Sequence, residues 1–99
     1  MEDAALRRDI DLAIEEYERL IGGYATYTHR MIDTYGPKEA LCRLMADSKI
    51  QKGLKTLARA GKLDISFEAI VVRHRGSFRQ PIIDAAEWRL ERARLGDFD

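Results

Sequence analysis

The sequence predicts an all-α protein, a compact bundle of about six helices that forms a single domain over residues 1–99. Apolar residues recur at helical spacing in most segments, and glycine or proline separates these segments. Only one stretch alternates like a strand, and a lone strand has no partner for a sheet. The composition, 45% hydrophobic and 34% charged, is that of an ordinary globular domain.

The first predicted helix runs from Ala4 to Ile21. Its apolar side chains recur at alternating spacings of four and three residues, which places them on one face: Leu6, Ile10, Ala13, Tyr17 and Leu20. We expect Gly22 and Gly23 to end this helix, because glycine adopts the left-handed C-terminal conformation without steric cost.

Two short helices are predicted next, with a Gly-Pro corner between them. Thr26 or Thr28 is the candidate N-cap of the first, which we expect to stop at Gly36. Pro37 suits the first turn of the following helix, since its missing N–H lies among donors that have no helical partner. That helix is expected to end near Asp47 and to bury Ala40, Leu41, Leu44 and Met45.

The fourth and the last helix are predicted from their end signals. Ser48 and Gln51 fit a capping box that starts the fourth helix, and Gly61 is its expected stop. The last helix is predicted from Pro81 to about Leu95. Its expected inner stripe consists of Ile83, Ala86, Leu90 and Ala93.

The segment between them, LDISFEAIVVRH at residues 63–74, fits either a strand or a helix. A strand is favoured by the alternation of Ile65, Phe67, Ala69 and Val71, and a helix by the shared face of Phe67, Ile70, Val71 and His74. We favour the helix, because Ser66 can cap it and Glu68 lies near its positive end.

Several functional classes find no support in the sequence. The 17 basic and 17 acidic residues cancel, which removes the simplest argument for a nucleic-acid or membrane-surface protein. No nucleophile elbow, phosphate loop or dinucleotide fingerprint is present, and His29 and His74 lack neighbours at metal-ligand spacing. We therefore expect no enzyme activity, cofactor or metal. A single cysteine, Cys42, and a charged N-terminus predict a cytoplasmic protein without a membrane association.

Two groups of basic residues are candidate contact surfaces. The first is a stripe on the fourth helix, named here the basic stripe, formed by Lys49, Lys52, Lys55, Arg59 and Lys62. In a functional interpretation the basic stripe binds phosphates or an acidic protein surface. In the alternative interpretation it is the solvated face of an amphipathic helix. The second is the arginine loop, in which three guanidinium groups surround one ring: Arg73, Arg75, Phe78 and Arg79. Its alternative is a polar connection with the phenyl ring turned into the core.

The last helix has a second apolar side. Trp88 and Leu95 lie seven residues apart and about half a turn from the inner stripe. Either this helix is sandwiched within the domain, or both side chains anchor a protein partner or a second copy. The four tyrosines likewise fit either packing or an interface: Tyr17, Tyr24, Tyr27 and Tyr35.

Three segments carry a resemblance: MIDTYGPKEALCRLM, QKGLKTLARAGKLDISFEAIVV and AAEWRLERARL. Together they resemble a pattern in small uncharacterised bacterial proteins, some associated with phage and other mobile elements, and in the accessory helical tails of some restriction-type endonucleases. The resemblance covers roughly residues 30 to 95. It implies shared packing at Gly36, Gly53, Gly61 and Leu63-Asp64, and no catalytic residue. The lead into the last helix, Arg79-Gln80-Pro81, departs from the usual apolar and acidic pattern.

These observations together predict a non-catalytic helical binding protein that docks on a macromolecular partner, either another protein or a second copy. Given the resemblance, one concrete form is a phage-type inhibitor of a host nucleic-acid-processing or defence complex, similar in role to an anti-CRISPR protein. The alternative is a small nucleic-acid-binding protein that uses the basic stripe and the arginine loop.

Overall fold

Six α-helices make up most of the computed structural model, which describes residues 4–46 and 51–96. They are α1 (Ala4–Ile21), α2 (Thr26–Tyr35), α3 (Pro37–Met45), α4 (Gln51–Arg59), α5 (Phe67–Arg73) and α6 (Gln80–Arg94). Two short 3-10 helices, η2 (Leu63–Ile65) and η3 (Arg75–Ser77), flank α5. The described ranges contain no strand, so the predicted all-α bundle of about six helices is confirmed.

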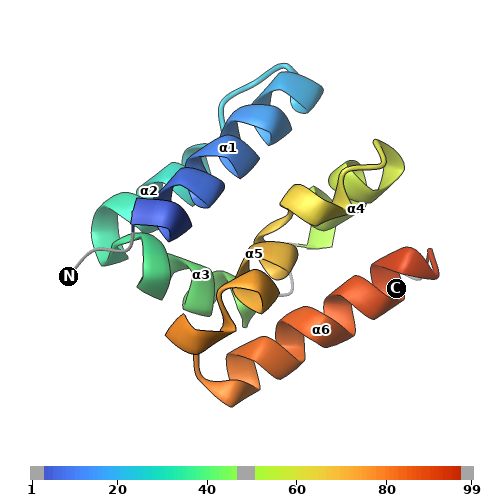
Figure 1. Cartoon of the computed structure of the whole chain (residues 1–99). Coiled ribbons are helices and arrows are strands. Elements are labelled where there is room, and N and C mark those ends of the chain that lie inside the picture. The colour runs from blue at the N-terminus through green and yellow to red at the C-terminus, as the bar shows by residue number, and fades with distance from the viewer. Residues whose placement is uncertain (1–3, 47–50, 97–99) are drawn as a thin grey trace.

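The short helix α5 lies at the centre of the bundle. It packs against α6, α1 and α3, and Figure 1 shows α1 and α6 on opposite sides of it. The main core cluster draws on α1, α2, α3, α5 and α6, with these side chains fully buried: Ile10, Leu41, Leu44, Ile70 and Val71. Helix α4 contacts α1 and α6 and contributes buried Leu54 and Leu57 beside this cluster.

Helix α1 has the predicted bounds, but its buried face differs from the predicted stripe at one end. Leu6, Ile10 and Ala13 are buried as expected, and Ile14 is buried beside them. Tyr17 is half-buried, and Leu20 is 37% exposed, so the prediction that Leu20 packs inward is wrong. The burial of α1 stops at Ile14 because its last two turns extend past the main cluster.

The corner between α2 and α3 depends on a glycine. Gly36 has φ 83° and ψ 161°, a combination that is accessible essentially only to glycine. Its N–H donates to the carbonyl of Ile32 at 2.8 Å, and Pro37 then occupies the first turn of α3, as predicted. The predicted threonine cap of α2 is wrong, because the N-cap is Ala25 and no side chain caps this end.

Helix α5 is a helix and not a strand, as predicted. Ser66 is its N-cap, and its Oγ accepts a hydrogen bond from the N–H of Ala69 at 3.1 Å. The same hydroxyl donates to the carbonyl of Leu63 at 2.6 Å, which ties η2 to α5. Burial against α1 and α6 outweighs the low helix propensity of Ile70 and Val71.

The remaining boundaries are close to the expected ones. Helix α6 begins at Gln80, one residue before the predicted start at Pro81, and ends at Arg94. Gly61 follows α4 within the turn that ends it. Ser48, the first member of the predicted capping box, lies outside the described residues, so that box stays a prediction.

Candidate functional site

Two apolar side chains project from the surface of α6. The ring of Trp88 is 55% exposed and Leu95 is 73% exposed, so the interpretation that this helix is sandwiched within the domain is wrong for both. The guanidinium carbon of Arg92, one turn from Trp88, lies 4.4 Å from the centroid of the indole ring and stacks on it. We name Trp88, Arg92 and Leu95 the outer face of α6.

The opposite side of α6 is buried as predicted, through Ile83, Ala86, Leu90 and Ala93. Arg89 is buried beside this stripe, and its Nη1 lies 3.4 Å from Oε2 of Glu68 in α5. Burial raises the pKa of the Glu68 carboxyl, because removal from water disfavours its charged form. Successive residues of a helix differ by 100°, so Trp88 lies about half a turn from the centre of this buried stripe and faces outward.

The basic stripe is only partly available to a partner. Lys62 forms an ion pair with Glu16 of α1 at 3.0 Å, so its charge is shared within the chain. Hydrogen bonds from Arg19 and Lys62 lower the pKa of the Glu16 carboxyl. Lys52 and Arg59 are exposed and Lys55 is half-buried. Lys49 lies outside the described residues.

The arginine loop does not form the predicted stacking surface. Phe78 is only 9% exposed and belongs to the core cluster, so the interpretation that turns its ring into the core is confirmed and the one that makes it available to a base is wrong. Arg75 pairs with Glu87 of α6 at 3.1 Å, and Arg73 pairs with Asp9 of α1 at 3.6 Å. Arg79 is exposed. The loop thus uses two of its guanidinium groups to bind neighbouring helices.

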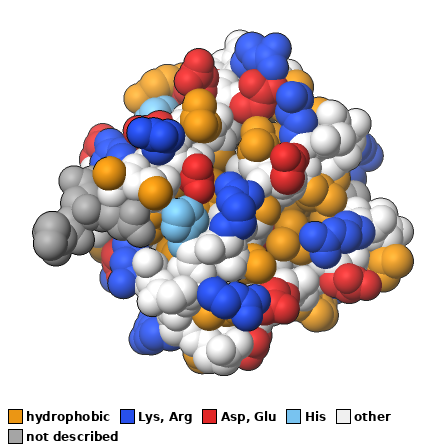
Figure 2. Space-filling view, in the orientation of Figure 1, with side chains coloured by type: hydrophobic (Ala, Val, Ile, Leu, Met, Phe, Trp, Pro, Cys, Tyr) orange, Lys and Arg blue, Asp and Glu red, His pale blue; other side chains and the backbone are white. Residues whose placement is uncertain are grey.

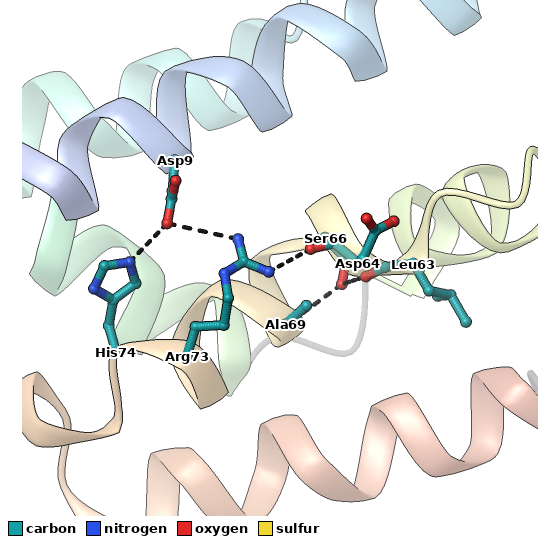
Figure 3. Close-up of polar contacts among 7 residues, drawn as sticks. All are labelled: Asp9, Leu63, Asp64, Ser66, Ala69, Arg73 and His74. Carbon is teal, nitrogen blue, oxygen red and sulfur yellow. Dashed lines mark hydrogen bonds and ion pairs between the residues drawn. The ribbon is translucent and has the colours of Figure 1, made fainter.

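A polar cluster that sequence analysis does not identify joins α1 to the end of α5. Oδ2 of Asp9 lies 2.7 Å from Nε2 of His74 and also contacts Arg73, as Figure 3 shows. Arg73 also donates to the backbone carbonyl of Asp64, next to the Ser66 cap. The hydrogen bond from His74 lowers the pKa of the Asp9 carboxyl, and the charge of Arg73 adds to this effect. Figure 2 shows that acidic and basic side chains are interspersed on this face of the molecule.

A second polar cluster holds the turn between α1 and α2. Oε2 of Glu18 accepts a hydrogen bond from the N–H of Ala25 at 2.7 Å and lies 3.0 Å from Nε2 of His29. Both contacts lower the pKa of the Glu18 carboxyl, the backbone N–H more than the histidine. The ring of His29 stacks on Tyr24, with centroids 4.3 Å apart. This turn is therefore fixed by one carboxylate from α1.

An apolar cleft of about 270 Å³ opens beside this turn. Its walls come from α1, the turn, the start of α2, α4 and the first residues of α5, and they include Tyr17, Tyr27, Gly53, Leu57 and Phe67. The buried Glu68 also lines it. Sequence analysis does not predict this cleft; the tyrosines were the only signal for it, and their pattern fits packing equally well.

Comparisons with known proteins give no further information about the site. The chain matches no protein-family model, no curated protein and no solved structure. Within residues 4–46 and 51–96, no three histidine, cysteine or acidic side chains are grouped in a way that could hold a metal ion. No helix in the same ranges is both long and apolar enough to cross a membrane. Cys42 is half-buried, and burial raises the pKa of its thiol.

Proposed function

We propose that the protein is a docking module that binds another protein through the outer face of α6. The observation that carries this proposal is the exposure of Trp88 and Leu95 on a helix whose opposite side is fully packed. Tryptophan is enriched among the residues that contribute most to protein–protein affinity. The position of Arg92 over the indole ring keeps the ring in one orientation before a partner arrives.

The charges beside this face define the chemistry of the partner. Asp84 and Glu91 are exposed, and helical geometry places both on the same flank of Trp88. Glu87 lies on this flank too, but its charge is already paired with Arg75 at 3.1 Å. We therefore infer a partner with an apolar groove that receives Trp88 and Leu95, and with lysine or arginine side chains along one edge of that groove. In an antiparallel dimer the acidic flanks of the two copies would face each other, and this repulsion disfavours a second copy as the partner.

The experiment places a photoreactive phenylalanine analogue at Trp88 in one variant and at Leu12 in another, each expressed in the source cells. Leu12 lies on α1 and is 53% exposed, so it matches Trp88 in exposure at a different surface. We expect a discrete protein adduct from position 88 that survives nuclease treatment, and none from position 12. Equal adducts from both positions, or none from either, would contradict the proposal.

The captured protein then allows a quantitative test with purified components. Trp88→Ala is expected to weaken binding by about 2 kcal/mol or more, which is roughly thirtyfold in Kd, because a central aromatic anchor is lost. Leu12→Ala is expected to leave Kd unchanged. Sedimentation of the free protein at increasing concentration tests whether the outer face of α6 binds a second copy of the chain. A dimer that Trp88→Ala dissociates would show that the partner is a second copy and not another protein.

Two narrower hypotheses stay predictions. An inhibitor of a host nucleic-acid-processing complex would require the captured protein to belong to such a complex. Nucleic-acid binding through the basic stripe and the arginine loop would require a steep loss of affinity with salt, because phosphate contacts release counterions. The internal ion pairs of Lys62, Arg73 and Arg75 and the burial of Phe78 make this second hypothesis the weaker one.

A further inference from the structure

The apolar cleft is a second candidate site, on a different part of the molecule from the outer face of α6. Leu54 and Leu57 of α4 are buried, and both line the cleft together with Tyr17 of α1 and Phe67 of α5. Ile21, Tyr24 and Tyr27 surround it and remain between 44% and 68% exposed. Apolar walls with an aromatic rim are typical of small-molecule sites.

One wall of the cleft is held in place before any ligand binds. Glu18 accepts the N–H of Ala25 and contacts His29, and the ring of His29 stacks on Tyr24 with an angle of 8° between their planes. One carboxylate thus contacts both the backbone N–H of Ala25 and the ring of His29, and these contacts restrict the turn and the stacked ring of Tyr24 before a ligand enters. Preorganisation of this kind lowers the entropic cost of binding.

One residue that lines the cleft is a glycine in the first turn of a helix. Gly53 is the third residue of α4, whereas the other described glycines lie in turns, at helix ends or in η3. Glycine has a lower helix propensity than alanine. A Cβ added at Gly53 would approach the ring of Tyr17 to 3.7 Å, an ordinary contact, so packing does not require glycine there. Its effect is to leave space in the cleft.

The size and charge of the cleft define the class of ligand. An apolar cavity of about 150 Å³ holds one benzene ring, so about 270 Å³ corresponds to a molecule with two fused rings. Two charged groups line the cleft: the buried Glu68, which the guanidinium of Arg89 already balances, and the exposed Lys52. A cationic ligand would lose hydration without gaining an acidic partner. The cleft therefore disfavours a cation.

We propose that the cleft between α1, α4 and α5 binds a small bicyclic aromatic molecule that carries no positive charge. Its rings lie between Tyr17 and Phe67 and above Gly53, while Tyr24 and Tyr27 cover the open side. This site is independent of the docking proposal, because Trp88 and Leu95 do not line it.

Indole is the probe for the first experiment. It is titrated into the full chain while ¹H–¹⁵N correlation spectra are recorded. We expect saturable shifts of the Gly53 and Phe67 amides with a Kd of about 1 mM or below. Tryptamine and indole-3-acetate carry the same rings with opposite charges, and we expect tryptamine to bind more weakly than indole or indole-3-acetate. No saturation at millimolar indole would overturn the proposal, as would shifts centred on the outer face of α6. Binding of tryptamine as tight as that of indole would overturn the exclusion of cations.

Substitutions at Gly53 test the position of the ligand. Gly53→Leu fills the cleft and is expected to raise the Kd for indole by about tenfold or more. Gly53→Ala occupies roughly one methyl group of space, and it is expected to raise Kd about fourfold and to stabilise α4. Gly76→Ala, at a position with open surroundings, is the matched control and is expected to change neither property. Unchanged indole affinity in both folded Gly53 variants would overturn the assignment.

Discussion

Replacing Arg89 by methionine tests the buried ion pair that joins α5 to α6. The N–O distance is 3.4 Å, at which two unit charges attract by about 5 kcal/mol for an effective dielectric constant of roughly 20. Desolvation of both ions offsets most of this attraction while the pair is intact. Arg89→Met leaves Glu68, which is 2% exposed, without its partner, and we expect a loss of about 3–5 kcal/mol in unfolding free energy.

The pH dependence identifies the unpaired carboxylate as the cause. The pKa of Glu68 in the folded protein is already raised by burial above the ordinary value of 4.5, and loss of Arg89 raises it further. A raised folded pKa contributes stability that is present below the unfolded pKa and is lost as the pH rises through the folded pKa. We therefore expect Arg89→Met to be least destabilising near pH 4.5 and most destabilising near neutrality.

Urea unfolding followed by far-UV circular dichroism measures both effects, for the wild type, Arg89→Met, Glu68→Leu and the double variant. Replacement of both partners by apolar side chains removes the uncompensated charge, so the double variant is expected to lie within about 1 kcal/mol of the wild type. The reasoning is refuted if the double variant loses the sum of the single effects, or if Arg89→Met shows the same loss at every pH.

Three further predictions concern single contacts. Asp9→Asn is expected to cost about 1–2 kcal/mol near neutral pH, measured by urea unfolding. His74 and Arg73 lower the pKa of Asp9 in the folded protein. Asp9 therefore contributes to the unfolding free energy above its ordinary pKa of 3.8, and this contribution disappears as the pH falls through the folded pKa. An equal loss of unfolding free energy in Asp9→Asn at low pH would contradict this. Ser66→Ala is expected to cost about 1 kcal/mol through loss of the α5 cap, and an unchanged urea midpoint would exclude that role. Gly36→Ala is expected to cost about 1–3 kcal/mol, whereas Gly76→Ala, without a positive φ, serves as the neutral control; equal thermal midpoints for the two variants would contradict the backbone argument.

Local signals in the sequence predicted most of the secondary structure. Helix ends are marked by Gly22, Gly36 and Gly61, whose positive φ angles are unfavourable for other residues. This signal depends on one residue and needs no knowledge of distant contacts. The cap residue Ser66 likewise led to the correct prediction of a helix for α5, because its hydrogen bond to the N–H of Ala69 spans only three residues. The inner stripe of α6 followed from helical periodicity alone.

Contacts between distant parts of the chain were not predictable in this way. Asp9 and His74 are 65 positions apart, and Glu68 and Arg89 are 21 apart, so no spacing rule connects them. The arginine loop shows the same limit, since Phe78 has the same sequence context whether its ring faces water or the core. The exposure of Trp88 was left as one of two alternatives, because helical periodicity does not show whether another element covers the second side of α6.

The attachment of α4 has a consequence for hydrogen exchange. This helix packs beside the main cluster through Leu54 and Leu57, whereas α1 and α5 supply side chains that are completely buried within it. We therefore expect the amides of α4 to exchange through a local opening that leaves the other helices folded. The amides of α5 are expected to exchange only through global unfolding of the domain. The local opening would separate α4 from α1 and would move Gly53 away from the ring of Tyr17.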